Sequence, residues 1–128
     1  MPPVIGYVTL GSRDIDRAAQ FYDRLFEAIG GSRVFSRGTY IAWSNGAGQP
    51  MIGVLEPANG DPATSGNGTM IAFKMEDMET VDKLHALVLE LGGENEGDPG
   101  LRSENFYAAF FKDLDGHKFN FYCKPVPQ

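Results

Sequence analysis

Residues 14–31 read DIDRAAQFYDRLFEAIGG, and residues 77–93 read DMETVDKLHALVLELGG. Both stretches begin with an aspartate, a favoured helix N-cap because its carboxylate accepts from free N–H groups of the first turn. Both continue with apolar residues at helical spacing and end at a glycine pair, where a helix terminates readily. Because the second aspartate follows the first by 63 residues, the repeat predicts two similar units that bury their apolar faces together.

Strands are expected on both sides of each helix. Apolar and β-branched runs predict them over residues 4–10, 33–37, 38–44, 50–56, 69–75, 105–112 and 117–124. Residues 94–102 are expected to be mostly irregular, with a short edge strand as the alternative, and the Gly- and Pro-rich residues 57–68 are expected to join the halves. The prediction is a single α+β domain over residues 1–128, with two βαβββ modules in tandem, about 1–57 and about 69–128.

Composition excludes several classes of protein. The chain has 128 residues and a net charge of −6 without a cluster of Lys or Arg, so we expect no nucleic-acid partner. Its apolar runs are shorter than the ~20 residues of a membrane helix, and no basic segment precedes the first strand, so neither membrane nor export is expected. The single cysteine, Cys123, has no internal disulfide partner, which suits a reducing cytoplasm.

Strand alternation separates an apolar face from a polar one, because successive side chains point to opposite sides of a sheet. In the last strand one face carries His117, Phe119, Phe121 and Cys123, and the other carries Lys118, Asn120 and Tyr122. The aromatic face suits packing beneath a helix, so the polar face is expected to line a cavity. The same alternation places Tyr7 and Thr9 together, and likewise Met70, Ala72 and Lys74.

Four segments together resemble the vicinal-oxygen-chelate superfamily, which includes glyoxalase I, bleomycin-resistance proteins and extradiol dioxygenases. They are residues 7–22 (with YVTL before DIDRAAQFY), 66–73 (GNGTMIAF), 99–102 (PGLR) and 112–119 (KDLDGHKF). The resemblance implies mixed sheets that curl around one cleft, helices on the outer face, and often a homodimer.

The resemblance also implies a divalent metal, held in that cleft by His, Gln or Glu from strands of both modules. This chain has Tyr7, Gly53, Met70 and Asn120 at the corresponding positions. A neutral phenol, a thioether and an amide are poor ligands for such ions, and glycine offers no side chain. We therefore expect no metal and no other cofactor.

The remaining reactive side chains have simpler expected roles. His85 lies on the apolar stripe of the second helix, and His117 and Cys123 share the aromatic face of the last strand, so all three are expected to be packed. Asp113 and Asp115 belong to a turn, where short side chains bind the backbone. Arg102 is expected either in a surface salt bridge or as a clamp for a carboxylate.

Two functions remain open after these assignments. The first is a protein that binds a small, largely apolar molecule, and the acidic net charge is compatible with a cationic one. Its predicted lining is Tyr7, Thr9, Met70, Lys118, Asn120 and Tyr122, with Lys74 nearby and either Trp43 or Tyr40 according to register. The alternative is a glyoxalase-type lyase, isomerase or dioxygenase with unorthodox metal ligands or metal-free acid/base chemistry, for which Tyr7 and Asn120 are the catalytic candidates.

Overall fold

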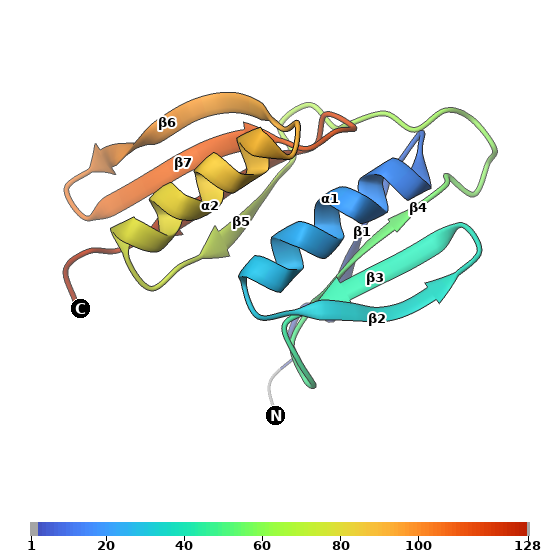
Figure 1. Cartoon of the computed structure of the whole chain (residues 1–128), viewed down its shortest axis with the longest axis horizontal. Coiled ribbons are helices and arrows are strands. Elements are labelled where there is room, and N and C mark those ends of the chain that lie inside the picture. Colours follow the sequence, from blue (N-terminus) through green and yellow to red (C-terminus); the bar gives the residue numbers. More distant parts are fainter. Residues whose placement is uncertain (1–2, 128) are drawn as a thin grey trace. The chain divides into compact units, whose positions relative to one another are not determined.

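The computed structural model describes residues 3–127 and divides the chain into two compact units, Met1–Thr64 and Ser65–Gln128. Each unit holds one helix and one four-stranded mixed sheet, as Figure 1 shows. This arrangement confirms the predicted α+β plan of two βαβββ modules. The boundary between the units falls inside the predicted connecting loop.

The first unit has its elements in the predicted order. They are β1 (Tyr7–Gly11), α1 (Ile15–Ala28), β2 (Ser32–Arg37), β3 (Tyr40–Ser44) and β4 (Met51–Leu55). The sheet order is β1-β4-β3-β2, with β1 parallel to β4 and the other pairs antiparallel. The prediction that the first strand starts at Val4 is wrong, because pairing begins at Tyr7 and leaves Val4 72% exposed.

The second unit repeats this topology with sheet order β5-β8-β7-β6. Its elements are β5 (Met70–Lys74), α2 (Met78–Glu90), β6 (Glu94–Ser103), β7 (Phe106–Lys112) and β8 (Lys118–Cys123). The expectation that residues 94–102 are mostly irregular is wrong, because the edge strand considered there is the ten-residue β6, which pairs with β7 through three register shifts. One shift spans Gly97 to Gly100 and contains Pro99, at a bulge where the ladder needs no N–H donor.

The two helices begin in the same way. The side chain of Asp14 accepts from the Arg17 N–H at 3.0 Å, and that of Asp77 accepts from the Thr80 N–H at 2.8 Å. Both predicted N-caps are therefore confirmed, and each satisfies an N–H group that the helix itself leaves free.

Each helix covers one face of its own sheet, and the burial of the strands follows. On β8, Phe119, Phe121 and Cys123 have no exposed surface, whereas Lys118 on the opposite face is exposed. On β5, Met70, Ala72 and Lys74 are all more exposed than the alternate residues. The predicted alternation is thus confirmed for both strands, and the face turned away from α2 is the open face of this sheet.

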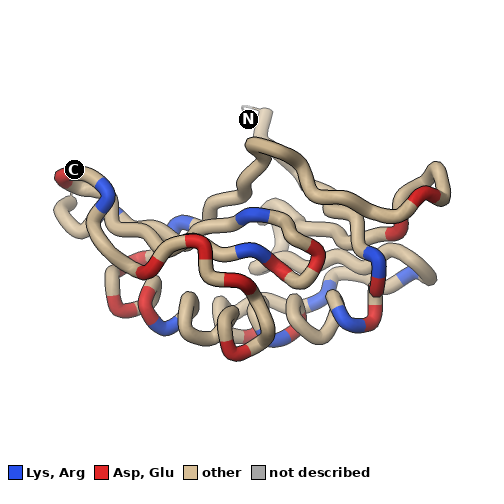
Figure 2. The backbone as a smooth tube through the Cα atoms, turned by 90° about the horizontal axis from the view of Figure 1, so that it is seen from above, with Lys and Arg blue, Asp and Glu red and all other residues tan. Residues whose placement is uncertain are grey.

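Charged residues show no basic concentration in the part of the chain that the structure describes. Figure 2 shows the Lys and Arg positions interspersed among the Asp and Glu positions along the backbone. Over residues 3–127, neither helix is long and apolar enough to cross a membrane.

Candidate functional site

The candidate site is the open face of the second sheet, where the strand register brings side chains from β5, β8 and β7 into rows. Lys118 of β8 has Met70 and Lys112 as its neighbours on the adjacent strands. The next row along the same face is Ala72, Asn120 and Phe110, and the third is Lys74, Tyr122 and Ala108. The structure therefore brings together Met70, Lys118, Asn120 and Tyr122, four of the predicted lining residues.

Asn120 is the most constrained polar group on this face. Only 2% of the residue is exposed, and its Oδ1 atom has no hydrogen-bond partner among residues 3–127. A buried acceptor without a partner costs roughly 1–3 kcal/mol, so native proteins rarely keep one. Strand β8, in the interior of the sheet, thus holds a buried acceptor without a partner among the described residues.

Phe110 lies beside Asn120 and supplies an aromatic surface between two cations. The Lys118 ammonium lies 5.4 Å from the centre of the Phe110 ring, and the Arg102 guanidinium carbon lies 5.4 Å from the same centre. Arg102 is held there by hydrogen bonds to the carbonyls of Asp98 and Gly100, at 2.6 and 2.8 Å. The guanidinium therefore hydrogen-bonds the backbone of its own strand, β6, and does not form the surface salt bridge considered from the sequence.

The first unit carries the other two predicted lining residues, Tyr7 and Thr9, on β1. They lie opposite Met51 and Gly53 of β4, and Tyr7 is 60% exposed. Of the two aromatic alternatives, Trp43 packs with Tyr22 and Phe26 of α1 and is fully buried. It therefore lies on the helix side and is excluded from the open face of its sheet.

Tyr40 lies against the backbone of Gly53, one of the four positions at which the resemblance led us to expect a metal ligand in the family. A Cβ atom added to Gly53 would lie 2.5 Å from Cε1 of Tyr40 and 3.0 Å from its hydroxyl oxygen. The phenol ring thus fills the space that a ligating side chain would need. Over residues 3–127, no three His, Cys, Asp or Glu side chains form a group that could hold a metal ion.

The remaining reactive residues are packed or belong to turns. His85 is 3% exposed, and its Nε2 lies 3.1 Å from both the Asn95 Oδ1 and the Phe110 carbonyl oxygen. Because both neighbours are acceptors, Nε2 carries the proton. Asp113 Oδ1 accepts from the backbone N–H groups of Asp115 and His117, which confirms the turn interpretation.

Cys123 is buried and forms no disulfide. Burial, reinforced by the negative charges of Asp77 and Asp82, raises the pKa of this thiol above its usual value. The reactive thiolate is therefore disfavoured at neutral pH. This agrees with the prediction that Cys123 is a small buried side chain and no nucleophile.

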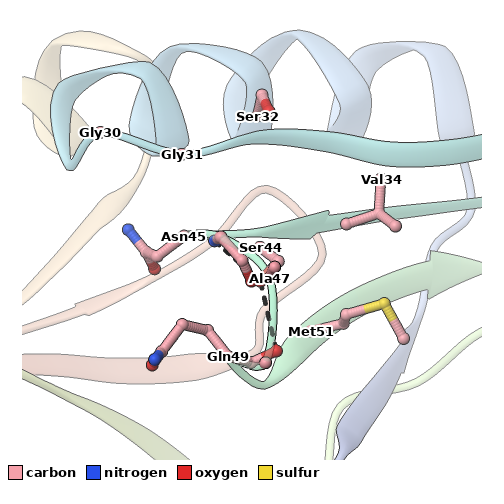
Figure 3. A pocket seen from close by; sticks show the side chains of 11 residues that line it. Gly30, Gly31, Ser32, Val34, Ser44, Asn45, Ala47, Gln49 and Met51 are labelled. Atoms are coloured by element: carbon pink, nitrogen blue, oxygen red, sulfur yellow. Dashed lines mark hydrogen bonds between the residues drawn. The ribbon is translucent and has the colours of Figure 1, made fainter.

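The first unit contains a pocket of about 450 Å³, shown in Figure 3, whose polar side chains mainly hold a turn together. It lies between the loop after α1 and the β3–β4 turn. The Ser44 hydroxyl bonds the carbonyls of Gly46 and Gln49 within that turn, and the Asn45 amide donates to the Ile29 carbonyl at the end of α1. The lining contains no charged side chain, so its main polar groups serve the turn.

Sequence reasoning missed two residues that shape these faces, Phe110 and Lys112, and it named Tyr40 only as an alternative to Trp43. Alternation along residues 106–112 would have placed Phe110 and Lys112 together, but their neighbours on β8 depend on the hairpin register. The contact between Tyr40 and Gly53 depends on pairing between β3 and β4 and has no local signal.

The chain belongs to the glyoxalase/bleomycin resistance protein/dioxygenase superfamily, whose sequence model matches residues 4–121. A glyoxalase/bleomycin resistance protein from Albidiferax ferrireducens T118 is 30% identical, with a TM-score of 0.85 over 94% of this chain and 98% of that one. A hypothetical protein from S. aureus is also 30% identical, with a TM-score of 0.73 over 96% and 94%. A fosfomycin resistance protein from Listeria monocytogenes shares the fold at 20% identity, with a TM-score of 0.74 over 98% and 97%. A search of curated proteins found no match.

Proposed function

We propose that this protein binds a small, largely apolar molecule on the open face of the second sheet. The observation that carries the proposal is the buried Asn120 Oδ1, which lacks a partner in the described chain. A ligand N–H or O–H group directed at this atom would remove the penalty of an unpaired acceptor. This hydrogen bond would both strengthen ligand binding and fix the orientation of the ligand.

The surroundings of Asn120 supply the apolar part of the site. Phe110 offers an aromatic ring, Ala72 leaves space because its side chain is short, and Met70 is 44% exposed at the edge. Met adapts its shape to different partners, and Phe binds flat groups well. A planar ligand with one donor suits this combination. That Tyr7 and Thr9 also line the site stays a prediction.

We further propose that binding needs no divalent metal. The chain has Tyr7, Gly53, Met70 and Asn120 at the family's ligand positions, and the Tyr40 ring occupies the space beside Gly53. These donors do not fit the family's metal, because phenol, thioether and amide groups bind such ions weakly. The alternative of a lyase, isomerase or dioxygenase gains no support from Tyr7, which is largely exposed in the isolated chain.

Two further parts of the proposal concern the oligomeric state of the protein and its location in the cell. The family often forms homodimers, and we propose the same for this chain. We also propose a cytoplasmic location, because the free thiol of Cys123 suits a reducing compartment.

The test compares wild-type protein with Asn120→Leu in a thermal-shift screen of planar small molecules. Without ligand, Asn120→Leu should match or exceed the stability of the wild type, since it removes an unpaired buried acceptor. With ligand, wild type should be stabilised more than the variant, by ~0.5–1.5 kcal/mol for the lost hydrogen bond. Asn105→Leu is the matched control, because both amide atoms of Asn105 bond Val126, so it should lower stability.

Two results would contradict the proposal. One is a set of ligands that stabilise wild type and Asn120→Leu equally, which would place binding elsewhere. The other is stoichiometric metal in protein purified without chelator or metal affinity resin, together with stabilisation by Ni, Zn, Mn or Fe(II) that EDTA reverses.

A further inference from the structure

A second pocket opens next to the candidate site, at the end of the sheet where β5 and β8 begin. Its volume is about 450 Å³, and all of its lining belongs to the second unit. The lining consists of residues 65–70 together with Glu96, Lys112, Gly116 and Lys118. Within a chain of net charge −6, this lining carries two ammonium groups and one carboxylate, so it is locally positive.

The two lysines lie directly opposite each other on neighbouring strands. Lys112 of β7 and Lys118 of β8 are register partners, so their side chains leave the sheet on the same face. The Cβ atoms of such a pair are about 4.5–5.5 Å apart, and like charges at this spacing destabilise a sheet. Within the lining, Glu96 offsets one charge, with its Oε1 3.6 Å from the Lys112 Nζ, and Glu94, the register partner of Lys112 on β6, lies in the same row outside the lining. Among the residues that line the pocket, one positive charge is thus left over.

Additional hydrogen-bond donors also line the pocket. The segment Ser65 to Thr69 lines it and contributes two hydroxyl groups among small residues. An oxyanion accepts several hydrogen bonds at once and is favoured by nearby ammonium groups. The chemistry of this lining therefore matches a carboxylate or a phosphate better than a cation, although the net charge of the whole chain is compatible with a cation.

Asn120 is outside the lining of this pocket, but it lies on the same strand face. Asn120 follows Lys118 by two residues and leaves the same face, which puts it about 7 Å further along β8. Phe110 lies beside Asn120, and the Lys118 ammonium reaches to 5.4 Å from its ring centre. One ligand of modest size can therefore span the lysines, the Phe110 ring and the Asn120 acceptor.

Resting on the proposed function, we infer that the ligand is an organic oxyanion. Its carboxylate or phosphate lies between Lys112, Lys118 and the Ser65–Thr69 segment. Its apolar or aromatic body lies against Phe110, and an O–H or N–H group about 7 Å from the anion donates to Asn120 Oδ1. The lysine pair then gains a counter-charge on binding, which removes the repulsion present in the free protein.

The test measures binding of 4-hydroxyphenylacetate and its neutral match, 4-hydroxyphenylacetamide, by backbone amide NMR titration of the whole chain. Wild type should bind the acid about two- to fivefold more tightly than the amide, the factor supplied by an exposed ion pair. Lys118→Gln and Lys112→Gln should lose this preference, and Lys124→Gln, a control outside the pocket, should keep it. Phenyl phosphate and inorganic phosphate, run in parallel, show which oxyanion is preferred.

The outcomes separate the two proposals. Equal affinity for acid and amide, or a preference that survives both pocket variants, overturns the oxyanion inference. If both probes still perturb Asn120 in that case, the proposed function stands. If inorganic phosphate perturbs the lysines while no organic probe reaches Asn120, the pocket binds oxyanions and the proposed function fails. If no probe perturbs either region, both are overturned.

A second measurement guards against misfolding of the variants. Without ligand, Lys118→Gln should melt at or above the wild-type temperature, because it removes one of two facing like charges. Inorganic phosphate should raise the melting temperature of wild type and leave that of Lys118→Gln unchanged. A variant that melts lower without ligand would show that Lys118 stabilises the fold, and would overturn the inference.

Discussion

Asp23 on α1 joins three elements of the first unit through a single carboxylate. Arg33 of β2 binds both of its oxygens, at 2.8 and 2.9 Å, and the indole N–H of Trp43 on β3 donates to Oδ1 at 2.9 Å. The Arg33 hydrogen bond, aided by that from Trp43, holds the pKa of Asp23 below its usual value despite partial burial. The ionised carboxylate is therefore the form that stabilises this corner of the unit.

This network predicts an acid-dependent loss of stability. Because the pKa of Asp23 is lower in the folded state, its contribution is complete above the unfolded pKa of about 3.9 and disappears as pH falls through the folded pKa. Asp23→Asn should lower the free energy of unfolding at pH 7 by up to ~1 kcal/mol, since the pair is partly exposed. Chemical denaturation at pH 7 and near pH 3 checks whether the difference shrinks, with Asp61→Asn in an exposed loop as control. An undiminished difference at low pH would contradict the assignment.

At the scale of elements, the two helix ends are built alike. Gly31 donates to the Phe26 carbonyl at 2.7 Å and Gly93 to the Val88 carbonyl at 2.8 Å, after Gly30 and Gly92 turn the chain with positive φ angles. The second glycine of each pair also passes close to a strand. A Cβ at Gly93 would lie 2.8 Å from the Val88 carbonyl oxygen and 3.0 Å from that of Lys112. The glycine pairs are thus needed for both the turn and the packing.

Gly93→Ala should destabilise the protein by ~1–3 kcal/mol, because both crowding atoms belong to the backbone and a strand would have to shift. Gly6→Ala is the matched control: a Cβ there meets nothing within 4 Å. It should be neutral or slightly stabilising, through the lower entropy of the unfolded chain. Thermal unfolding of both variants provides the comparison. Equal melting temperatures would show that α2 and β7 tolerate a wider separation than the structure indicates.

At the scale of the whole molecule, the chain consists of two units with the same strand order. Each unit has its own helix-covered sheet, and in the second unit the centre of the Phe111 ring lies 5.3 Å from that of Phe119 and 5.0 Å from that of Phe121. Apolar side chains also remain outside these cores, including Val4, Ile5 and Tyr7 near the start of the chain, each at least 60% exposed. Exposed apolar groups of this kind are typical of surfaces that associate.

The proposed homodimer is tested by light scattering coupled to size exclusion. A dimer should show about twice the chain mass of 14.0 kDa across the micromolar range. A constant single-chain mass at these concentrations would contradict the proposal. The same runs with and without 4-hydroxyphenylacetate show whether ligand binding and association are linked, since a ligand that binds one state preferentially shifts the balance.

The helix caps, glycine pairs and strand faces could be predicted because each depends on residues that are close in sequence. Asp14 and Asp77 cap helices through N–H groups three residues away. The ten-residue β6 could not be predicted, since its bulges interrupt the alternation that would reveal a strand. Four of the six predicted lining residues share one face of the second sheet. The roles of Phe110 and Lys112 needed the β7–β8 register.

The sequence by itself determined the tandem α+β plan and the ends of both helices. These features follow from local hydrogen bonding, side-chain periodicity and residue identity. Only the tertiary structure decided that Asn120 Oδ1 is buried without a partner, that Tyr40 fills the space beside Gly53, and that Lys112 faces Lys118. Each of these depends on which residues of different strands become neighbours, and that is settled by register and packing across the sheet.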